Sequence, residues 1–207
     1  MLTLEKSIAV LRRDKHFAPL IKKYGPPVLK RGRNPFQSLA RAIIRQQISG
    51  KAADSIEARF VGLFGGKRFP TPDEIVAVPL SKLRSAGLSG QKASYIKDLA
   101  EKFTDGTIKH RSLNKMQSEE IIEHLLQVKG IGVWTTHMFL IFTLNRPDIL
   151  PTGDLGIRKG FQMVYGLKSL PDHKKMELLA KPWRAHASLA SWYLWRVADE
   201  VKTRISK

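Results

Sequence analysis

Asp154 is the acidic residue of this chain whose position suggests chemistry. It follows Leu150-Pro151-Thr152-Gly153 and precedes an apolar helical pattern that begins at Leu155. An aspartate at the start of a helix most often acts as an N-cap, accepting a hydrogen bond from an amide of the first turn. The same hydrogen bond keeps the carboxylate ionised, and an ionised carboxylate can stabilise a cationic sugar transition state. The sequence leaves the structural and the catalytic role both open.

A second candidate site is a glycine hairpin in the segment 125–136, LLQVKGIGVWTT. Ser118 is the expected N-cap of the preceding helix, and Gly130 can take the left-handed conformation that ends it. Gly132 permits a close approach to the backbone where the next helix begins. That beginning carries amides without intrahelical partners and the positive end of the helix dipole, so it can bind one phosphate. The hairpin is either a grip for a DNA backbone, which reads no sequence, or an ordinary turn between two helices.

The charge balance favours a nucleic-acid partner. The chain has 36 Lys and Arg against 18 Asp and Glu, a net charge of +18, which attracts polyanions. The basic residues are spread along the chain, and this favours a folded basic face over a disordered arm. A ribosomal-type protein or a basic membrane-surface protein would share this charge. The chain lacks cysteine, which excludes disulfides, thiolate zinc sites and cysteine-ligated iron–sulfur clusters.

Length and hydropathy set the remaining limits. The 207 residues, 43% of them apolar, can form one large domain or two small lobes. Residues 1–13 lack the apolar core of a signal peptide, and the longest apolar run, residues 138–144, is too short to span a membrane. We therefore expect a soluble, intracellular protein, in the cytoplasm or nucleoid of a prokaryote or in a eukaryotic nucleus.

Apolar residues recur at helical spacing along nearly the whole chain, and no alternating strand pattern persists. The weakest seams are residues 30–34 and 145–153, which are rich in Pro, Gly, Arg or Asn. The sequence therefore predicts an all-α fold with helices near residues 4–13, 16–24, 36–50, 51–64, 80–86, 91–104, 155–165, 171–180 and 182–202, a short helix that starts at residues 71–74, and a pair of helices on either side of Gly130.

Five segments match a known family in their order along the chain. They are RAIIRQQIS (41–49), GLSGQKA (87–93), GIGVWT (130–135), LPTGD (150–154) and KPWR (181–184). Together they resemble the helix-hairpin-helix DNA glycosylase superfamily, and within it the 3-methyladenine DNA glycosylase II branch, over about residues 35–195. That family has an invariant aspartate about twenty residues after the last hairpin position, and Asp154 stands there. Larger relatives carry an additional β-rich N-terminal domain for which there is no room before Pro35, and this departure puts the substrate range in doubt.

The resemblance implies a two-lobed helical bundle with a cleft between the lobes. Residues 35–146 would form the lobe that contains the helix-hairpin-helix motif. Residues 1–34 and 147–207 would form the second lobe, because in the family the start of the chain packs with its end. This second lobe would carry Asp154.

The resemblance also implies a base pocket lined by Trp134, Trp192 and Met138. Trp134 stands where glycosylases with lyase activity have the lysine that forms a Schiff base with the sugar, so we expect a monofunctional enzyme that uses water. An alkylated purine is positively charged, and an aromatic face attracts a cation by roughly 0.5–2 kcal/mol. Trp183 and Trp195 are expected to be core residues.

The residues expected to contact DNA lie in two segments. Lys129, Gly130, Ile131 and Gly132 of the hairpin would grip phosphates. Gln46 and Gln47 interrupt the otherwise apolar-patterned end of the helix expected at residues 36–50, and Ser49 lies in the same segment; the plain alternative there is a solvated helix end. By resemblance Gln47 is the wedge residue that enters the duplex and fills the gap left by a flipped base.

No metal constellation is expected, because the six histidines are not spaced as ligands with acids or cysteines. The family resemblance implies a monovalent cation at the hairpin, held by the backbone carbonyls of Leu126, Val128 and Ile131. No cofactor is required for the expected reaction.

The sequence thus predicts a monofunctional DNA glycosylase that removes alkylated purines, chiefly 3-methyladenine-like lesions, in base excision repair. Its partner would be double-stranded DNA containing alkylated bases, and it would act as a monomer away from membranes. The alternatives are a non-catalytic DNA-binding or damage-sensing protein and a glycosylase for a deaminated or oxidised base.

Overall fold

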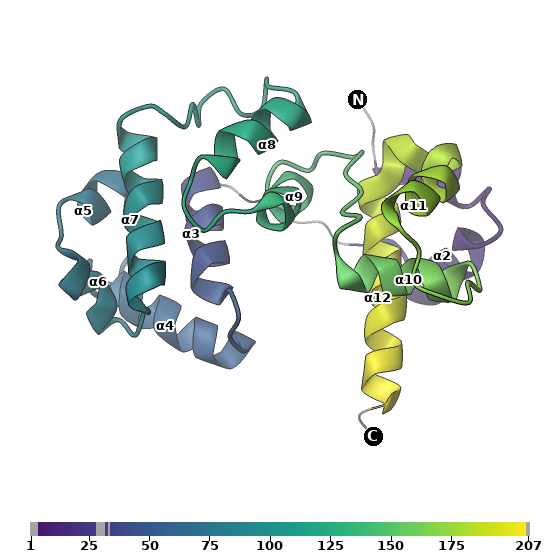
Figure 1. Ribbon diagram of the computed structural model, residues 1–207, viewed down its shortest axis with the longest axis horizontal. Coiled ribbons are helices and arrows are strands. Elements are labelled where there is room, and N and C mark those ends of the chain that lie inside the picture. Colours follow the sequence, from purple (N-terminus) through teal and green to yellow (C-terminus); the bar gives the residue numbers. More distant parts are fainter. Residues whose placement is uncertain (1–3, 28–31, 33, 206–207) are drawn as a thin grey trace. The chain divides into compact units, whose positions relative to one another are not determined.

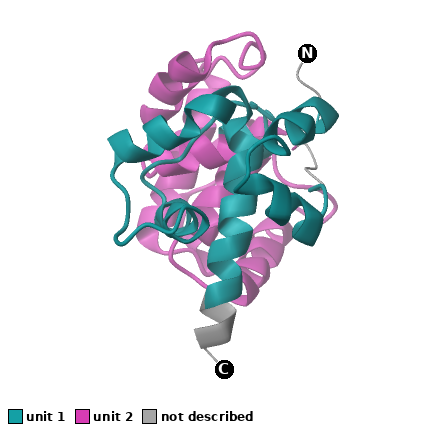
Figure 2. Ribbon diagram, turned by 90° about the vertical axis from the view of Figure 1, so that its right-hand side faces the viewer, with its two compact units in different colours: residues 1–30, 140–207 teal, residues 31–139 magenta. Residues whose placement is uncertain are grey.

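The computed structural model describes residues 4–27, 32 and 34–205, with the backbone alone from residue 202 onward. Across these residues the secondary structure is helical, without a strand (Figure 1), which confirms the predicted all-α class. The chain forms two compact units (Figure 2): unit 1 comprises residues 1–30 and 140–207, and unit 2 comprises residues 31–139. The predicted seam at residues 30–34 lies mostly outside the described residues.

Unit 2 is built around one long helix, α7. The helices α3, α5 and α6 pack against it, and the aromatic rings of Phe36 and Phe103 meet edge to face in the core with centroids 5.2 Å apart. The helices of this unit are α3 (Pro35–Arg45), α4 (Gly50–Gly62), α5 (Pro72–Val76), α6 (Leu80–Ser85), α7 (Gly90–Thr104), α8 (Ser118–Leu126) and most of α9 (Val133–Phe142).

Unit 1 is built around the C-terminal helix α12, against which α10 and α2 pack. Its core is rich in aromatic residues: the rings of Phe17 and Phe161 pack on Trp183, with centroids 5.2 and 5.9 Å away. Trp183 is buried, as predicted. The elements of this unit are α1 (Leu4–Leu11), α2 (Phe17–Tyr24), α10 (Leu155–Val164), α11 (His173–Ala180), a 3₁₀ helix (Lys181–His186) and α12 (Ala187–Ile205).

Side-chain caps explain where many of these helices begin. Asn34, Ser49, Ser89, Asp154 and Asp172 each accept a hydrogen bond from an amide in the first turn of the helix that follows. Each such cap contributes about 1 kcal/mol. Two of these capping residues, Ser49 and Asp154, are also predicted site residues. In the structure each of them caps the start of a helix.

Three predicted helix ends were wrong. Helix α3 ends at Arg45 and not at residue 50, because Gln46 is extended (ψ 130°) and Gln47 has a positive φ of 55°. Gln117, not Ser118, is the N-cap of α8, and its amide donates to the Glu120 carboxylate at 2.8 Å. The last helix is preceded by a 3₁₀ turn in which Trp183 leaves helical geometry, next to a proline that cannot donate to a helical ladder.

No helix in the described part of the chain is both long enough and apolar enough to cross a membrane.

Candidate active site and nucleic-acid interface

The hairpin between α8 and α9 requires glycine at position 130 for two reasons. Gly130 has φ +81°, a conformation that side-chain-bearing residues avoid. In addition, a Cβ atom there would lie 2.0 Å from Cδ2 of Tyr95 on α7, because the ring covers the Gly130 Cα. The left-handed conformation predicted from the sequence is confirmed, and the ring of Tyr95 adds a contact that the sequence did not reveal.

A buried carboxylate anchors the same hairpin from its inner side. Asp98 on α7 is 7% exposed; its Oδ2 accepts a hydrogen bond from the Lys129 amide at 2.9 Å, and its Oδ1 accepts one from Lys102 Nζ at 2.6 Å. The ion pair with Lys102 offsets the cost of burying the charge. The Lys129 side chain remains 69% exposed, with its ammonium 3.9 Å from Asp98 Oδ1, so its charge is accessible to a polyanion.

Helix α9 begins at an open surface. The Thr136 amide donates to the Gly132 carbonyl at 3.0 Å, which makes Gly132 the residue where the helix starts. A Cβ on Gly132 would meet nothing within 4 Å, and Val133 and Trp134 are 48% and 53% exposed. The positive end of the α9 dipole therefore faces accessible space beside Lys129, and this is the geometry that favours a phosphate.

The segment after α3 is tied to this hairpin within unit 2. Gln46 Nε2 donates to the Gly130 carbonyl at 2.8 Å. Lys92 Nζ donates to the carbonyls of Ile44 and Gln46, at 2.7 Å each, and burial lowers the pKa of Lys92 below its ordinary value. These bonds satisfy carbonyls at the end of α3, and they explain why the helix stops before residue 50.

Gln46 and Gln47 thus occupy different environments. The Gln46 side chain is directed at the hairpin backbone, whereas Gln47 is exposed and held at φ +55°. A non-glycine residue in this region is uncommon and strained. Ser49 caps α4, with its Oγ accepting from the Ala52 amide at 3.4 Å.

Asp154 in unit 1 is the N-cap of α10, and two donors meet at one of its oxygens. Oδ1 accepts a hydrogen bond from the Ile157 amide at 2.8 Å and a second from Trp195 Nε1 on α12, also at 2.8 Å. The carboxylate is half-buried. Sequence reasoning placed Trp195 in the core and missed this contact, because nothing in the pattern of α12 points at residue 154.

The predicted base-pocket residues divide between the two units. Trp134 and Met138 belong to unit 2, where Trp134 is exposed and Met138 is half-buried. Trp192 belongs to unit 1 and is half-buried. Its ring centroid lies 5.0 Å from that of Tyr193, and the Arg196 guanidinium lies 5.3 Å from the Trp192 centroid. Each tryptophan offers an aromatic surface in its own unit.

The hairpin carbonyls are the donor type that suits a monovalent cation, since they are neutral oxygens. The Val128 carbonyl accepts a hydrogen bond from the Ile131 amide at 3.1 Å, which occupies one of its two lone pairs. The donor set of Leu126, Val128 and Ile131 therefore fits such a cation in kind, and the cation remains a prediction. Among the described residues no cluster of three or more His, Cys, Asp or Glu side chains could hold a metal ion.

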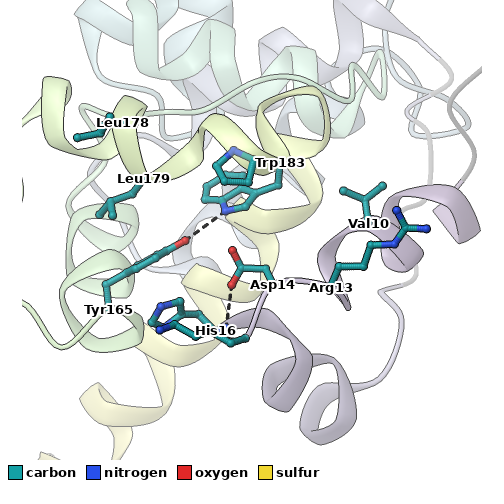
Figure 3. Close-up of a pocket in the computed structure, with 10 residues that line it drawn as sticks. Val10, Arg13, Asp14, His16, Tyr165, Leu178, Leu179 and Trp183 are labelled. Atoms are coloured by element: carbon teal, nitrogen blue, oxygen red, sulfur yellow. Dashed lines mark hydrogen bonds between the residues drawn. The ribbon is translucent and has the colours of Figure 1, made fainter.

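A cavity of about 660 Å³ in unit 1 lies apart from the predicted site residues (Figure 3). The Trp183 indole donates to the Tyr165 hydroxyl at 3.2 Å, and the Asp14 carboxylate accepts from the His16 amide at 2.8 Å. Burial raises the pKa of Tyr165 to about 12. These two hydrogen bonds lie in the cavity wall, and none of the residues that line the cavity is a predicted site residue.

The chain is similar to known proteins of one family. The family model described as HhH-GPD superfamily base excision DNA repair protein matches residues 40–185. DNA-3-methyladenine glycosylase 1 of Schizosaccharomyces pombe is 36% identical over 189 residues, which cover 89% of this chain and 81% of that protein.

Two solved structures are similar over almost the whole chain. One is a 3-methyladenine DNA glycosylase of the same yeast in complex with abasic DNA, with a TM-score of 0.81 at 34% identity, covering 94% of this chain and 97% of that one. The other is a DNA-3-methyladenine glycosidase from Bacillus halodurans, with a TM-score of 0.83 at 35% identity, covering 95% of this chain and 89% of that one.

Proposed function

This chain belongs to the HhH-GPD superfamily of base excision DNA repair proteins, and on that premise we propose that it is a monofunctional DNA glycosylase. It hydrolyses the N-glycosidic bond of alkylated purines, chiefly 3-methyladenine-like lesions, and leaves an abasic site. The names of its relatives support the substrate class. The observation that carries the catalytic assignment is the Asp154 carboxylate, whose Oδ1 is fixed by two N–H donors at 2.8 Å.

The Ile157 amide and the Trp195 indole are formally neutral donors, so these two hydrogen bonds orient the Asp154 carboxylate without neutralising it. An N-alkylated purine is cationic; when its bond to C1′ breaks, the base takes the electron pair and departs neutral. Positive charge then develops on the sugar, and an oriented carboxylate stabilises it. Water adds to C1′ and loses a proton to solvent, which balances the reaction without a covalent enzyme intermediate.

In unit 2 the hairpin provides the sequence-independent grip on DNA. The start of α9 and the exposed Lys129 ammonium bind backbone phosphates; Gly130 makes the turn at φ +81°, and Gly132 leaves the start of α9 accessible. Gln47 is the wedge: its side chain is exposed, and its backbone has a positive φ of 55°. Trp134 offers its exposed face to the cationic base. Trp192 and Met138 help to select which base is bound.

The partner is double-stranded DNA containing alkylated bases, and the protein acts on it as a monomer inside the cell. No resident cofactor takes part in the reaction. Recognition depends on charge and on the aromatic faces, both of which this chain supplies itself.

The test is the release of bases from methylated DNA by wild type and by Asp154→Asn, identified by chromatography. Asparagine caps helices as well as aspartate does, and its Oδ1 can accept both existing hydrogen bonds, so the variant removes the charge and keeps the cap. We expect excision to fall about 10²–10³-fold and binding to abasic-analogue DNA to persist. The matched control is Asp172→Asn, which makes the same change at the N-cap of α11 and should leave excision intact.

The alternatives differ from this result and, with a second substrate, from each other. A damage-sensing protein would bind alkylated DNA without releasing a base from any substrate. A glycosylase for another base would also leave methylated purines in place, but it would release bases from a second duplex that contains deaminated or oxidised purines. Near wild-type release by Asp154→Asn would contradict its assignment as the essential carboxylate.

A further inference from the structure

We propose that Trp195 is a positioning residue for Asp154, and that Gly156 and Gly160 of α10 bring it there. This inference rests on the proposed glycosylase function, since it concerns the carboxylate that the reaction uses. It assigns a role to three residues that the family pattern read from the sequence did not single out.

The two glycines lie one turn apart on the same face of α10, which reads LGIRKGFQMV. Residues four apart in a helix are stacked on one face. A Cβ on Gly160 would lie 2.5 Å from the carbonyl oxygen of Leu194 and 2.8 Å from the Cβ of Leu194. The backbones of α10 and α12 are therefore in direct contact at Gly160, where any side chain would push the helices apart.

One turn earlier, Gly156 faces Trp195, the residue that follows Leu194 on α12. A Cβ on Gly156 would lie 2.9 Å from Trp195 Cδ1 and 3.0 Å from Asp154 Oδ1. Both distances are shorter than ordinary contacts of a Cβ atom. The space left by the missing side chain is thus the space in which the indole edge reaches the carboxylate.

The indole is held from a second direction. The Phe142 ring at the end of α9 packs on Trp195, with centroids 5.8 Å apart and an interplanar angle of 30°. The indole N–H then has little freedom to turn away from Asp154 Oδ1, which it meets at 2.8 Å. The contact is a consequence of packing by three elements and not of a flexible surface side chain.

A tryptophan is chemically suited to this task. A lysine or arginine at the same place would also orient the carboxylate, but its positive charge would weaken the attraction between Asp154 and a sugar cation. The indole N–H is a donor without a formal charge. Together with the Ile157 amide it fixes the direction of the carboxylate and leaves the charge for the reaction.

The test is a double-mutant cycle with Trp195→Phe and Asp154→Asn, measured as single-turnover excision rates on methylated duplex at saturating protein. Phenylalanine keeps an aromatic ring and removes only the N–H donor. We expect Trp195→Phe to slow excision about 10- to 100-fold, the value of a hydrogen bond to a charged group. The affinity for abasic-analogue DNA should remain within about twofold.

The cycle distinguishes positioning from a general structural role. If Trp195 acts through Asp154, adding Trp195→Phe to Asp154→Asn causes no further loss of rate. Equal losses in both backgrounds would overturn the proposal. Full excision by Asp154→Asn alone would instead show that the proposed catalytic role of Asp154 fails, so the two failures are distinct.

Two further variants keep the result interpretable. Trp183→Phe removes another indole donor of unit 1, one that bonds to Tyr165 and not to Asp154, and should leave the rate per folded molecule within about twofold. Gly156→Ala inserts one methyl between the indole and the carboxylate, and should reproduce the rate loss of Trp195→Phe with DNA affinity retained. A wild-type rate in a folded Gly156→Ala variant would contradict the proposed placement.

Discussion

The substitution Gly130→Ala tests whether the hairpin is held in the shape that binds DNA. Two costs add in this variant. An alanine at φ +81° costs roughly 1–2 kcal/mol. The new methyl would also lie 2.0 Å from the Tyr95 ring, so ring or hairpin must move by more than 1 Å relative to ordinary contact, and overpacking of this kind typically costs about 1–3 kcal/mol. We expect a total loss of about 2–5 kcal/mol in the free energy of unfolding.

Gly106→Ala isolates the first of these costs. Gly106 has nearly the same conformation, φ +82°, but a Cβ there would meet nothing within 4 Å. It should therefore cost about 1–2 kcal/mol, or about 2–4 °C of melting temperature for each kcal/mol in a chain of this length. In a Tyr95→Ala background, where the ring is gone, Gly130→Ala should cost no more than Gly106→Ala does in wild type.

Urea unfolding gives the stabilities, and titration with abasic-analogue duplex gives the affinities. A hairpin displaced by the ring loses about one charge-assisted hydrogen bond to phosphate, which corresponds to a roughly tenfold weaker affinity, whereas Gly106→Ala should bind as wild type. The reasoning is refuted if Gly130→Ala and Gly106→Ala have the same stability within about 0.5 kcal/mol and the same affinity, since strain would then be the whole effect.

Three further outcomes follow from the same site. Borohydride should trap no covalent adduct with DNA, because Trp134 stands where lyases have lysine; a stoichiometric Schiff-base adduct on any lysine would contradict this. Lys129→Met should reduce the log–log salt slope of DNA binding by about 1, since one phosphate contact is lost; an unchanged slope would exclude Lys129 from the interface. Gln47→Ala should slow excision from duplex far more than from single strands, where no gap needs filling, and should leave the melting temperature unchanged because Gln47 is exposed. An equal loss on both substrates would place the wedge elsewhere.

Features that depend on one residue and its chain neighbours were predictable from the sequence. The left-handed Gly130 and the N-cap at Asp154 are of this kind, because each follows from the conformational preference of a single residue type. Ordered motifs also identified the family, which the comparisons confirm. The all-α class was predictable as well, because helical periodicity is a pattern of residues close together in the chain.

Features that depend on distant residues were not predictable. The end of α3 was misplaced because Lys92, 46 positions beyond Gln46, donates to its carbonyl. Asp98 binds the Lys129 amide across 31 positions, and Trp195 binds Asp154 across 41. No local pattern encodes such pairs: a single acid in the otherwise apolar stripe of α7 is the only signal that could have pointed to Asp98.

The two roles of Asp154 that the sequence left open are compatible, and the surroundings of the residue favour the catalytic one. An N-cap needs only an amide of its own helix as donor, and Ile157 supplies it. The second donor comes from another helix and depends on glycines at positions 156 and 160 of α10. Each glycine inside a helix costs about 1 kcal/mol relative to alanine. A cap gains nothing from that arrangement, whereas a carboxylate that must face a sugar cation gains a fixed direction with its charge intact.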